Sequence, residues 1–285
     1  MRKLRERAKT IGFVPTMGAL HDGHLALVRR ARRENDIVAV SIFVNPAQFG
    51  PKEDFKRYPR TIGRDEKLLK NLKVDYLFHP TPKAMYPDSY ALKISMGSPW
   101  VKDRLRKKFF PLLENLCGKY RPGHFEGVMA IVAKLLVLAQ CHRTYFGQKD
   151  YQQAILIRRM IEDLHFDVIM KVLPTVRESD GLAMSSRNRY LSGDERRRAV
   201  ALSRTLFWLR GQVRSGTRNI LWLKREAARR LKPAVDKIQY FDIVDPQSLA
   251  SLRRWQTEMV VLTACFVGKT RLIDNVTIKV KNQKS

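Results

Sequence analysis

Two histidines three residues apart, His21 and His24, stand in the stretch PTMGALHDGH that spans residues 15–24. The stretch follows the apolar run TIGFVP and includes Gly18 and Gly23, which let the backbone approach a ligand closely. A helix that begins near Gly23 would point its N-terminal N–H groups at the same spot, and this favours an anion. Imidazoles add donors that can be charged or neutral near pH 7. The pattern favours contact with phosphate over purely local hydrogen bonds.

Two other segments carry groups that suit phosphate or a small polar substrate. MSSR, residues 184–187, offers two hydroxyls and a guanidinium, although a solvated linker has the same composition. YFGQKDYQQ, residues 145–153, places Lys149 where its charge can neutralise phosphate and Gln153 where its amide can bind a substrate. We expect both segments to follow strands or to form loops.

Amides and another histidine occur in two polar loops. FVNPAQFGPKEDFKRYPRT, residues 43–61, offers Asn45 and Gln48, and ordinary turn chemistry explains Asn45 about equally well. LCGKYRPGHFEGV, residues 116–128, contains Arg121 and His124, which either face the same cleft or cap the helix that follows.

Strand-like and helix-like runs alternate along the first part of the chain. Continuous apolar runs of β-branched residues predict buried parallel strands, and spacings such as Leu25, Val28 and Ala31 predict helices. The expected strands are 10–15, 36–46, 74–80 and 166–174, with a further strand that runs into a loop over 143–150, and the expected helices are 24–35, 63–72, 127–140 and 151–164. The alternation predicts an α/β fold, a Rossmann-like doubly wound parallel sheet over residues 1–174.

The pattern changes after residue 174. A polar connection, 178–195, leads to expected helices over 194–214 and 217–232 and to strand-like runs over 238–244, 258–267 and 271–280. These predict a smaller α+β C-terminal domain over residues 175–285.

Composition narrows the function classes. The 285 residues include 44% hydrophobic residues, and 55 Lys and Arg against 27 Asp and Glu give a net charge of +28. That charge fits an anionic partner, but no aromatic-interleaved basic motif accompanies it, so we expect no specific nucleic-acid partner. We expect a cytoplasmic protein without a signal peptide or membrane span, whose cysteines Cys117, Cys141 and Cys265 are buried or free thiols.

Six ordered segments together resemble the pantoate–β-alanine ligase family: FVPTMGALHDGH, VNPAQFGPKEDFKRYPRT, LCGKYRPGHFEGV, FGQKDYQQ, VRESDGLAMSSRNRYLS and GKTRLIDN. The resemblance spans residues 10–278, and H-x-G-H is the pattern of the nucleotidylyltransferase superfamily. It implies ATP-dependent condensation of pantoate with β-alanine through a pantoyl adenylate, with release of AMP and pyrophosphate. It also implies a homodimer, Mg²⁺ bound mainly through the ATP phosphates, and no dedicated metal site. Because MSSR lies beyond the expected domain boundary on a polar loop, we further expect the C-terminal domain to close over ATP as a lid.

The resemblance also implies roles for individual residues. His24, as proton donor, and His21, Lys149 and Arg187 are the implied catalytic residues. Gln48 and Gln153 are implied for pantoate, and Gln48 and Asn45 for β-alanine. The implied ATP-binding residues are Met17, Gly18, Ala19, Leu20, His21, Asp22, Gly23, His24, Gly147, Gln148, Lys149, Asp150, Val176, Met184, Ser185, Ser186 and Arg187.

The chain departs from the family pattern in two places, and two rival functions stand beside the ligase. Gln148 stands where the family commonly has Glu, and only nine residues precede Thr10, where the family usually has a further strand and helix. A different adenylyltransferase, which leaves AMP on its product, is the nearest rival function. A nucleic-acid-binding protein is the rival that the charge alone indicates.

Overall fold

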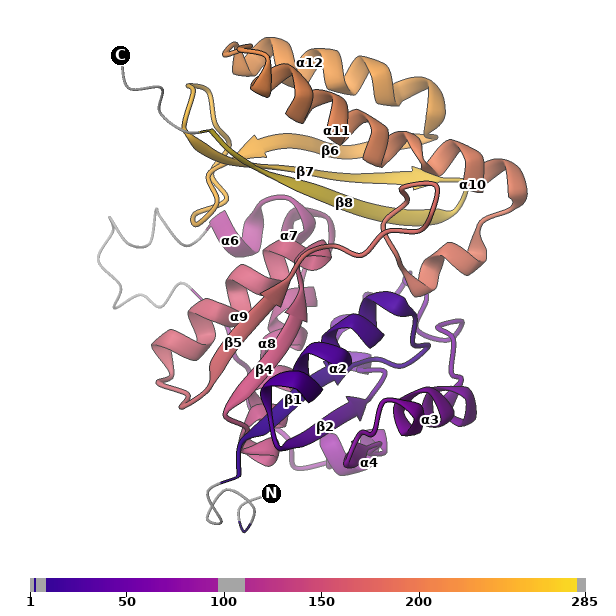
Figure 1. The fold of residues 1–285 in the computed structure, drawn as a ribbon, viewed down its shortest axis with the longest axis vertical. Helices are drawn as coiled ribbons and strands as arrows, with labels where there is room; N and C mark the ends of the chain where they lie inside the picture. The colour runs from indigo at the N-terminus through magenta and orange to yellow at the C-terminus, as the bar shows by residue number, and fades with distance from the viewer. Residues whose placement is uncertain (1–2, 4–8, 97–110, 281–285) are drawn as a thin grey trace. The chain divides into compact units, whose positions relative to one another are not determined.

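The computed structural model describes residues 3, 9–96 and 111–280, which fall into two compact units (Figure 1). The first unit contains residues 9–96 and 121–176, and the second contains residues 111–120 and 177–280. The division after Val176 lies close to the one expected after residue 174. Residues 111–120, expected in the first domain, belong to the second unit, where their side chains bond to its sheet. The expectation about the segment before Thr10 falls mostly outside the described residues.

A parallel five-stranded sheet in the order β3-β2-β1-β4-β5 forms the centre of the first unit. Its strands are β1 (Ile11–Thr16), β2 (Ile37–Ile42), β3 (Tyr76–Phe78), β4 (Arg143–Gly147) and β5 (Ile169–Leu173). Strand β1 pairs with β2 on one side and with β4 on the other. The carboxyl ends of β1 and β4 therefore form the switch point at which such sheets bind ligands. The predicted doubly wound parallel sheet is confirmed.

Helices and short 3₁₀ turns connect these strands: α2 (Asp22–Glu34), η1 (Pro46–Gln48), α3 (Ile62–Asn71), α4 (Pro82–Met85), α8 (His124–Ala139), η2 (Gln148–Asp150) and α9 (Tyr151–Asp163). Helix α2 packs on β1, β2 and β4 through the predicted face of Leu25, Val28 and Ala31, all of which are buried. Helix α8 is buried over most of its circumference, as expected for an apolar helix in a core. Together these elements cover the sheet. A ligand is therefore expected at the loops of its carboxyl edge.

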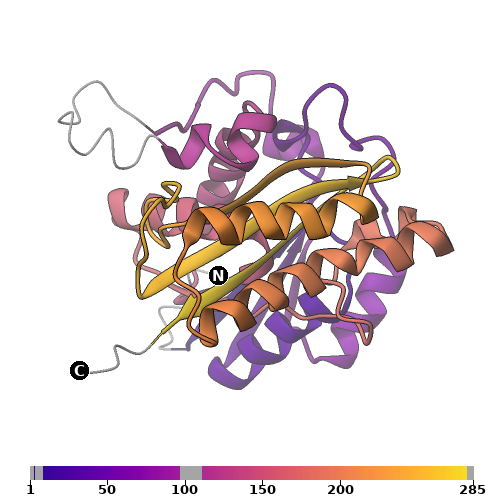
Figure 2. The same ribbon diagram turned by 90° about the horizontal axis from the view of Figure 1, so that it is seen from above.

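The second unit is built on an antiparallel sheet in the order β6-β7-β8. Its elements are α6 (Pro111–Glu114), α7 (Cys117–Tyr120), η3 (Ser186–Tyr190), α10 (Gly193–Ala199), α11 (Ala201–Arg214), α12 (Ile220–Leu231), η4 (Lys232–Ala234), β6 (Lys237–Val244), β7 (Glu258–Val267) and β8 (Thr270–Lys279). Helices α11 and α12 lie side by side over the sheet (Figure 2). Leu206, Leu209 and Leu223 lie in the core between these two layers. The predicted α+β arrangement is confirmed.

The prediction of one helix over 194–214 is wrong, because α10 and α11 meet at Val200. Ala199 and Val200 pack into an apolar cluster with Leu182, whereas Leu206 and Leu209 pack into a different cluster. We attribute the break to these two packing partners. The polar connection predicted over 178–195 likewise contains a 3₁₀ turn, η3, at its centre.

The three cysteines, Cys117, Cys141 and Cys265, are buried free thiols, as predicted. Within the described ranges, the structure contains no helix of the length and apolarity that a membrane crossing requires.

Candidate active site

The loop between β1 and α2 is held in an unusual conformation by a buried carboxylate. Gly18 and Ala19 both have positive φ, 78° and 49°. Asp65 of α3, 0% exposed, accepts the Ala19 N–H through Oδ2 at 2.8 Å and the Leu20 N–H through Oδ1 at 3.0 Å. A Cβ on Gly18 would lie 2.8 Å from Ile42, so the loop passes close to β2. Asp65 therefore fixes the turn that precedes the two histidines.

His21 and His24 lie against each other at the start of α2, with their rings tilted by 34°. Their ring centroids are 4.0 Å apart, and His21 is the N-cap residue of the helix. The Gly23 N–H donates to Nδ1 of His21 at 3.2 Å, and the His21 N–H donates to Nδ1 of His24 at 3.4 Å. Since a backbone N–H only donates, each Nδ1 is unprotonated, and a neutral ring carries its proton on Nε2. Both rings therefore offer an Nε2–H donor.

Burial, followed by the charge of the neighbouring His21, lowers the pKa of His24 to about 3. The charges of Asp150 and Lys149 also act on His24, the first raising its pKa and the second lowering it. The β1–α2 loop and the β4–α9 turn thus come together at the switch point. Nζ of Lys149 lies 3.9 Å from Oδ1 of Asp150. His24 is therefore neutral near pH 7.

Turn η1, which follows β2, brings Gln48 to the same loop. Nε2 of Gln48 lies 2.9 Å from Sδ of Met17, and Oε1 accepts from Nδ2 of Asn45 at 3.1 Å. Asn45 is 1% exposed and Gln48 is 8% exposed. Gln153, on the first turn of α9, is half-buried. The structure therefore places Gln48 against the predicted ATP-binding loop and encloses Asn45 more deeply.

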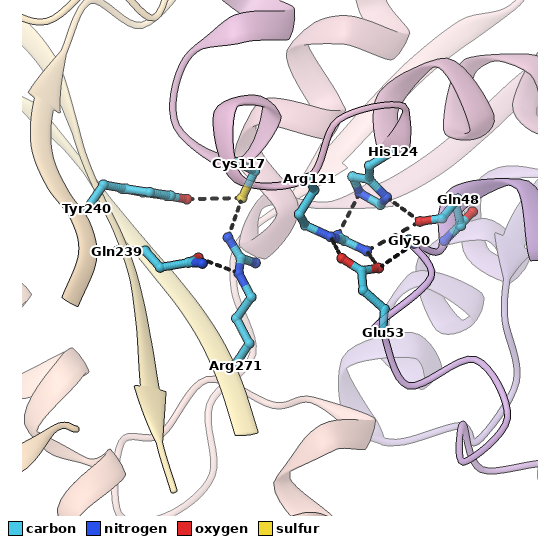
Figure 3. A network of polar contacts seen from close by, with 9 residues as sticks. All are labelled: Gln48, Gly50, Glu53, Cys117, Arg121, His124, Gln239, Tyr240 and Arg271. Carbon is cyan, nitrogen blue, oxygen red and sulfur yellow. Dashed lines mark hydrogen bonds and ion pairs between the residues drawn. The ribbon is translucent and has the colours of Figure 1, made fainter. Parts of the chain in front are cut away.

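Arg121 and His124 hold the loop that contains Gln48, rather than simply capping α8 (Figure 3). Arg121 pairs with Glu53, with Nε 2.6 Å from Oε1 and a second nitrogen 2.6 Å from Oε2. Burial opposes ionisation of Glu53, but Arg121 outweighs it and lowers the pKa of that carboxyl. Nδ1 of His124 lies 2.7 Å from the Gln48 carbonyl oxygen, so this nitrogen carries the proton and donates.

Nε2 of His124 lies 2.8 Å from an Arg121 nitrogen and accepts from it. Burial, followed by the positive charge of Arg121, lowers the pKa of His124 to about 3. The neutral ring thus bridges the arginine and the Gln48 backbone. Sequence reasoning left open whether these two residues cap the helix or face the cleft, and the structure gives them a third role.

The predicted MSSR segment lies in the second unit, at the start of η3. The Ser185 hydroxyl accepts from the Arg187 N–H at 3.3 Å, and Ser186 is buried. Arg177, just before the segment, forms a two-point pair with Asp274 of β8 at 2.7 and 2.9 Å, and the Asp274 side chain is 1% exposed. This pair ties the segment to the sheet.

A second arginine lies near Arg187 in the same unit. Arg271, at the start of β8, donates to the thiol sulfur of Cys117 at 3.3 Å and to Oε1 of Gln239 at 2.7 Å (Figure 3). The Cys117 sulfur also lies 3.1 Å from the Tyr240 hydroxyl. Burial, followed by Cys117, raises the pKa of that phenol. Arg187 is close enough for its positive charge to disfavour the charged form of Arg271, so two cationic side chains lie near each other in this unit.

The structure brings together the predicted residues of the first unit, namely Met17–His24, Gln48 and Lys149–Asp150. Met184–Arg187 belong to the second unit. Sequence reasoning missed Asp65, whose signal was a carboxylate on the apolar face of a predicted helix. It also missed Glu53 and Asp274, although both stand inside segments that carry the family resemblance. Within residues 9–96 and 111–280, no group of three or more His, Cys, Asp or Glu is placed to hold a metal ion.

Comparisons with known proteins agree with this geometry. The family described as pantoate-beta-alanine ligase matches residues 1–277. A pantothenate synthetase from Fervidobacterium nodosum is 47% identical over 282 residues, covering 98% of this chain and 96% of that protein. One from Thermotoga petrophila is 48% identical over 274 residues, covering 96% and 93%.

Solved structures are similar over nearly the whole chain. The crystal structure of pantothenate synthetase from Thermus thermophilus has a TM-score of 0.89 at 43% identity and covers 98% of both chains. A pantoate-beta-alanine ligase from Francisella tularensis, complexed with beta-gamma ATP and beta-alanine, has a TM-score of 0.76 at 35% identity and covers 95% of this chain and 90% of that one.

The doubly wound sheet, the paired histidines at its switch point and these similarities define a ligase of the α/β class. The chain belongs to the pantoate–β-alanine ligase family.

Proposed function

We propose that this protein joins pantoate to β-alanine in an ATP-dependent reaction that passes through a pantoyl adenylate. The supporting observation is the meeting of His21, His24, Lys149 and Gln48 at one edge of the parallel sheet. Donors of this kind suit phosphate oxygens and a small anion, and family membership supplies the identity of the substrates. The structure of the Francisella relative is a complex with beta-gamma ATP and beta-alanine.

The first step is attack by a pantoate carboxylate oxygen on the α-phosphorus of ATP. A carbon-linked oxygen–phosphorus bond forms, the bond from the α-phosphorus to the bridging oxygen breaks, and pyrophosphate leaves with the electron pair. Charge grows on phosphate oxygens as this happens, so donors fixed in advance should carry most of the catalysis. Neutral His24 donates through Nε2–H, and Lys149 adds a full positive charge. His21 and Arg187 are further donors in the proposal.

The second step is attack by the β-alanine amine on the acyl carbon of the adenylate. A carbon–nitrogen bond forms, the carbon–oxygen bond to AMP breaks, and the amine loses a proton as AMP leaves. Because an acyl adenylate hydrolyses in water, the site must exclude solvent while it waits for the amine. Gln48 and Gln153 are the proposed pantoate ligands, and Gln48 is the proposed β-alanine ligand. Asn45, which the resemblance also implied for β-alanine, has every hydrogen-bonding position of its amide used inside the protein.

The residues proposed to bind ATP are Met17 to His24, Gly147 to Asp150, Val176 and Met184 to Arg187. Mg²⁺ enters with the ATP phosphates and neutralises their charge. As the family resemblance implies, we propose no dedicated protein site for this ion. Gln148 leaves one negative charge fewer beside the phosphates than the usual Glu, and we expect activity to be retained.

We further propose a cytoplasmic homodimer. Three buried free thiols are typical of a reducing compartment, and the dimer rests on the family resemblance. The excess of positive charge is proposed to be a surface property without a specific nucleic-acid partner.

AMP formation from ATP tests this function, with Mg²⁺, pantoate and β-alanine present and then each omitted in turn. We expect AMP release to require both organic substrates and pyrophosphate release to require pantoate. AMP release that persists without β-alanine would indicate hydrolysis or a different acceptor. Pyrophosphate release without any AMP release would favour the rival adenylyltransferase. Binding of duplex DNA or RNA that persists at physiological salt would favour the nucleic-acid-binding function, because purely electrostatic binding weakens steeply with salt.

A further inference from the structure

Main-chain groups fix the orientation of the Asn45 side-chain amide. The Ala47 N–H lies 3.3 Å from one atom of that amide and the Gly127 carbonyl oxygen lies 3.1 Å from the other. A backbone N–H only donates and a backbone carbonyl only accepts. Oδ1 of Asn45 must therefore face Ala47, and Nδ2 must face Gly127.

The approach of α8 makes this arrangement possible. A Cβ on Gly127 would lie 2.1 Å from the Ala47 carbonyl oxygen, so only glycine lets the helix come this close to η1. The Asn45 side chain bridges the two elements at this contact.

All hydrogen-bonding positions of the Asn45 amide are used inside the protein. Nδ2 has two protons, which go to Gly127 and to Oε1 of Gln48 at 3.1 Å. Oδ1 has two lone pairs, which accept from the Ala47 N–H and from the hydroxyl of Tyr86 at 2.7 Å. With 1% of its surface exposed, Asn45 has no donor or acceptor left for a substrate.

The orientation of the Asn45 amide also fixes the orientation of the Gln48 side-chain amide. Because Nδ2 of Asn45 can only donate, Gln48 must turn Oε1 toward it, and Nε2 of Gln48 then faces Met17 of the β1–α2 loop. A thioether sulfur is a weak acceptor, so a carboxylate or hydroxyl oxygen of a substrate can replace it. Gln48 thus offers N–H donors, and not a carbonyl oxygen, on this side.

The Gln48 backbone is held separately. His124 and Arg121 both donate to its carbonyl oxygen, at 2.7 and 3.3 Å (Figure 3). The side-chain amide is left to Asn45, and Asn45 has one partner outside the main chain besides Gln48, the hydroxyl of Tyr86.

Tyr86 is itself fixed and keeps its proton. Its ring packs edge-on against Tyr90 with centroids 5.0 Å apart, and the Lys134 ammonium lies 5.2 Å from the Tyr86 ring centroid. Burial, followed by Tyr90, raises the pKa of the Tyr86 phenol to about 12. The hydroxyl therefore keeps its proton near neutral pH and donates its hydrogen bond to Asn45.

We infer that Tyr86 is a positioning residue, which acts through Asn45 to hold Gln48 with its N–H donors toward an anionic or hydroxylated substrate. The same geometry makes Asn45 a positioning residue and removes it as a direct β-alanine ligand. The inference rests on the proposed function only in taking that substrate to be pantoate.

The experiment compares Tyr86→Phe, which removes only the hydroxyl, with Tyr90→Phe, which keeps the Tyr86–Asn45 bond and alters the same aromatic cluster. The KM for pantoate, the KM for ATP and kcat are measured from AMP release. The loss of one buried hydrogen bond is expected to raise the pantoate KM about threefold to tenfold in Tyr86→Phe. The KM for ATP and the melting temperature of that variant, and all constants of Tyr90→Phe, should stay near wild type.

A second readout needs no substrate. In ¹⁵N-labelled protein, the side-chain amide resonance of Gln48, assigned by its loss in Gln48→Glu, should shift in Tyr86→Phe and stay in place in Tyr90→Phe. This arm stands even if the wild-type protein proves not to use pantoate, so failure of the proposed function and failure of this inference are distinguishable.

Three results would overturn the inference. One is an unmoved Gln48 amide resonance in Tyr86→Phe. Another is a rise in the ATP KM equal to that for pantoate, which would indicate general loosening. The third is an equal effect of Tyr90→Phe, which would assign the result to ring packing.

Discussion

Asp65 is the residue on which the turn proposed to bind phosphate depends most directly, and replacing it with Asn tests that dependence. The carboxylate accepts the N–H groups of Ala19 and Leu20 at 2.8 and 3.0 Å and the hydroxyl of Thr61 at 3.1 Å. Asn keeps the shape but replaces one oxygen with an NH₂ group. That NH₂ group must then face a donor, whichever way the amide turns.

The size of the effect follows from these contacts. A hydrogen bond to a charged group contributes about 1.5–3 kcal/mol, and a buried donor left without a partner costs about 1–3 kcal/mol. Asp65→Asn weakens one charged bond to a neutral one and breaks the other. We expect the free energy of unfolding to fall by about 2–4 kcal/mol.

The functional effect should concentrate on ATP. Gly18 and Ala19 hold left-handed backbone conformations, and for Ala19 that conformation costs energy that its bond to Asp65 offsets. Once the bond is lost, the turn relaxes and its N–H groups leave the position that suits phosphate. We expect the KM for ATP to rise about tenfold, which corresponds to about 1.4 kcal/mol.

Urea unfolding and AMP release measure the two effects. Glu66→Gln is the matched control, because it removes the same charge from the next residue of α3, where the side chain is exposed. Such a surface change should alter stability by less than about 0.5 kcal/mol. The reasoning fails if Asp65→Asn unfolds at the same urea concentration as this control and has its ATP KM.

Three other predictions concern the histidines and the second unit. His24→Ala should cut pyrophosphate release by orders of magnitude and keep the native circular dichroism spectrum; near-normal release would remove His24 from the chemistry. The folded pKa of His124, about 3, lies below its unfolded value of about 6.5, so the unfolded chain takes up the proton first as the pH falls. Stability is then lost below about pH 6.5, by about 2 kcal/mol at pH 5 from this residue, and His124→Gln should flatten the dependence of urea unfolding on pH. Asp274→Asn leaves Arg177 without its charged partner and should cost about 3 kcal/mol in urea unfolding, whereas Glu258→Gln, at an exposed pair on the same sheet, should cost less than about 1 kcal/mol.

The strands and most helices of this fold could be predicted because their signals are local. Continuous runs such as IVAVSI require burial on both faces, and the chain has enough helices to cover them. The same argument explains the two failures. The break at Val200 depends on two apolar clusters that come from distant segments. The place of residues 111–120 depends on contacts of Cys117 and Tyr120 with β6, more than a hundred residues along the chain.

Some residues of the candidate site could likewise be predicted from the sequence, and others could not. His21, His24 and Lys149 could be singled out because they stand in glycine-containing segments directly after expected strands. The residues that orient them could not. Asp65 looks like an ordinary helix carboxylate until its two N–H partners are seen. Asn45 looks like a ligand until all of its partners are found inside the protein.

The neutral state of His24 depends on its surroundings as well as on its own chemistry. A charged imidazole would attract phosphate more strongly, but the site already holds Lys149, and burial makes a second positive charge there costly. Two backbone N–H groups use Nδ1 of both rings, so the proton of a neutral ring lies on Nε2. The turn therefore converts histidine from a titrating group into a fixed donor, and what keeps the turn in place is the carboxylate of Asp65. The phosphate affinity proposed for this site then depends on backbone geometry as much as on the two imidazoles, which is why we expect Asp65 to affect ATP binding although it is not a proposed ATP ligand.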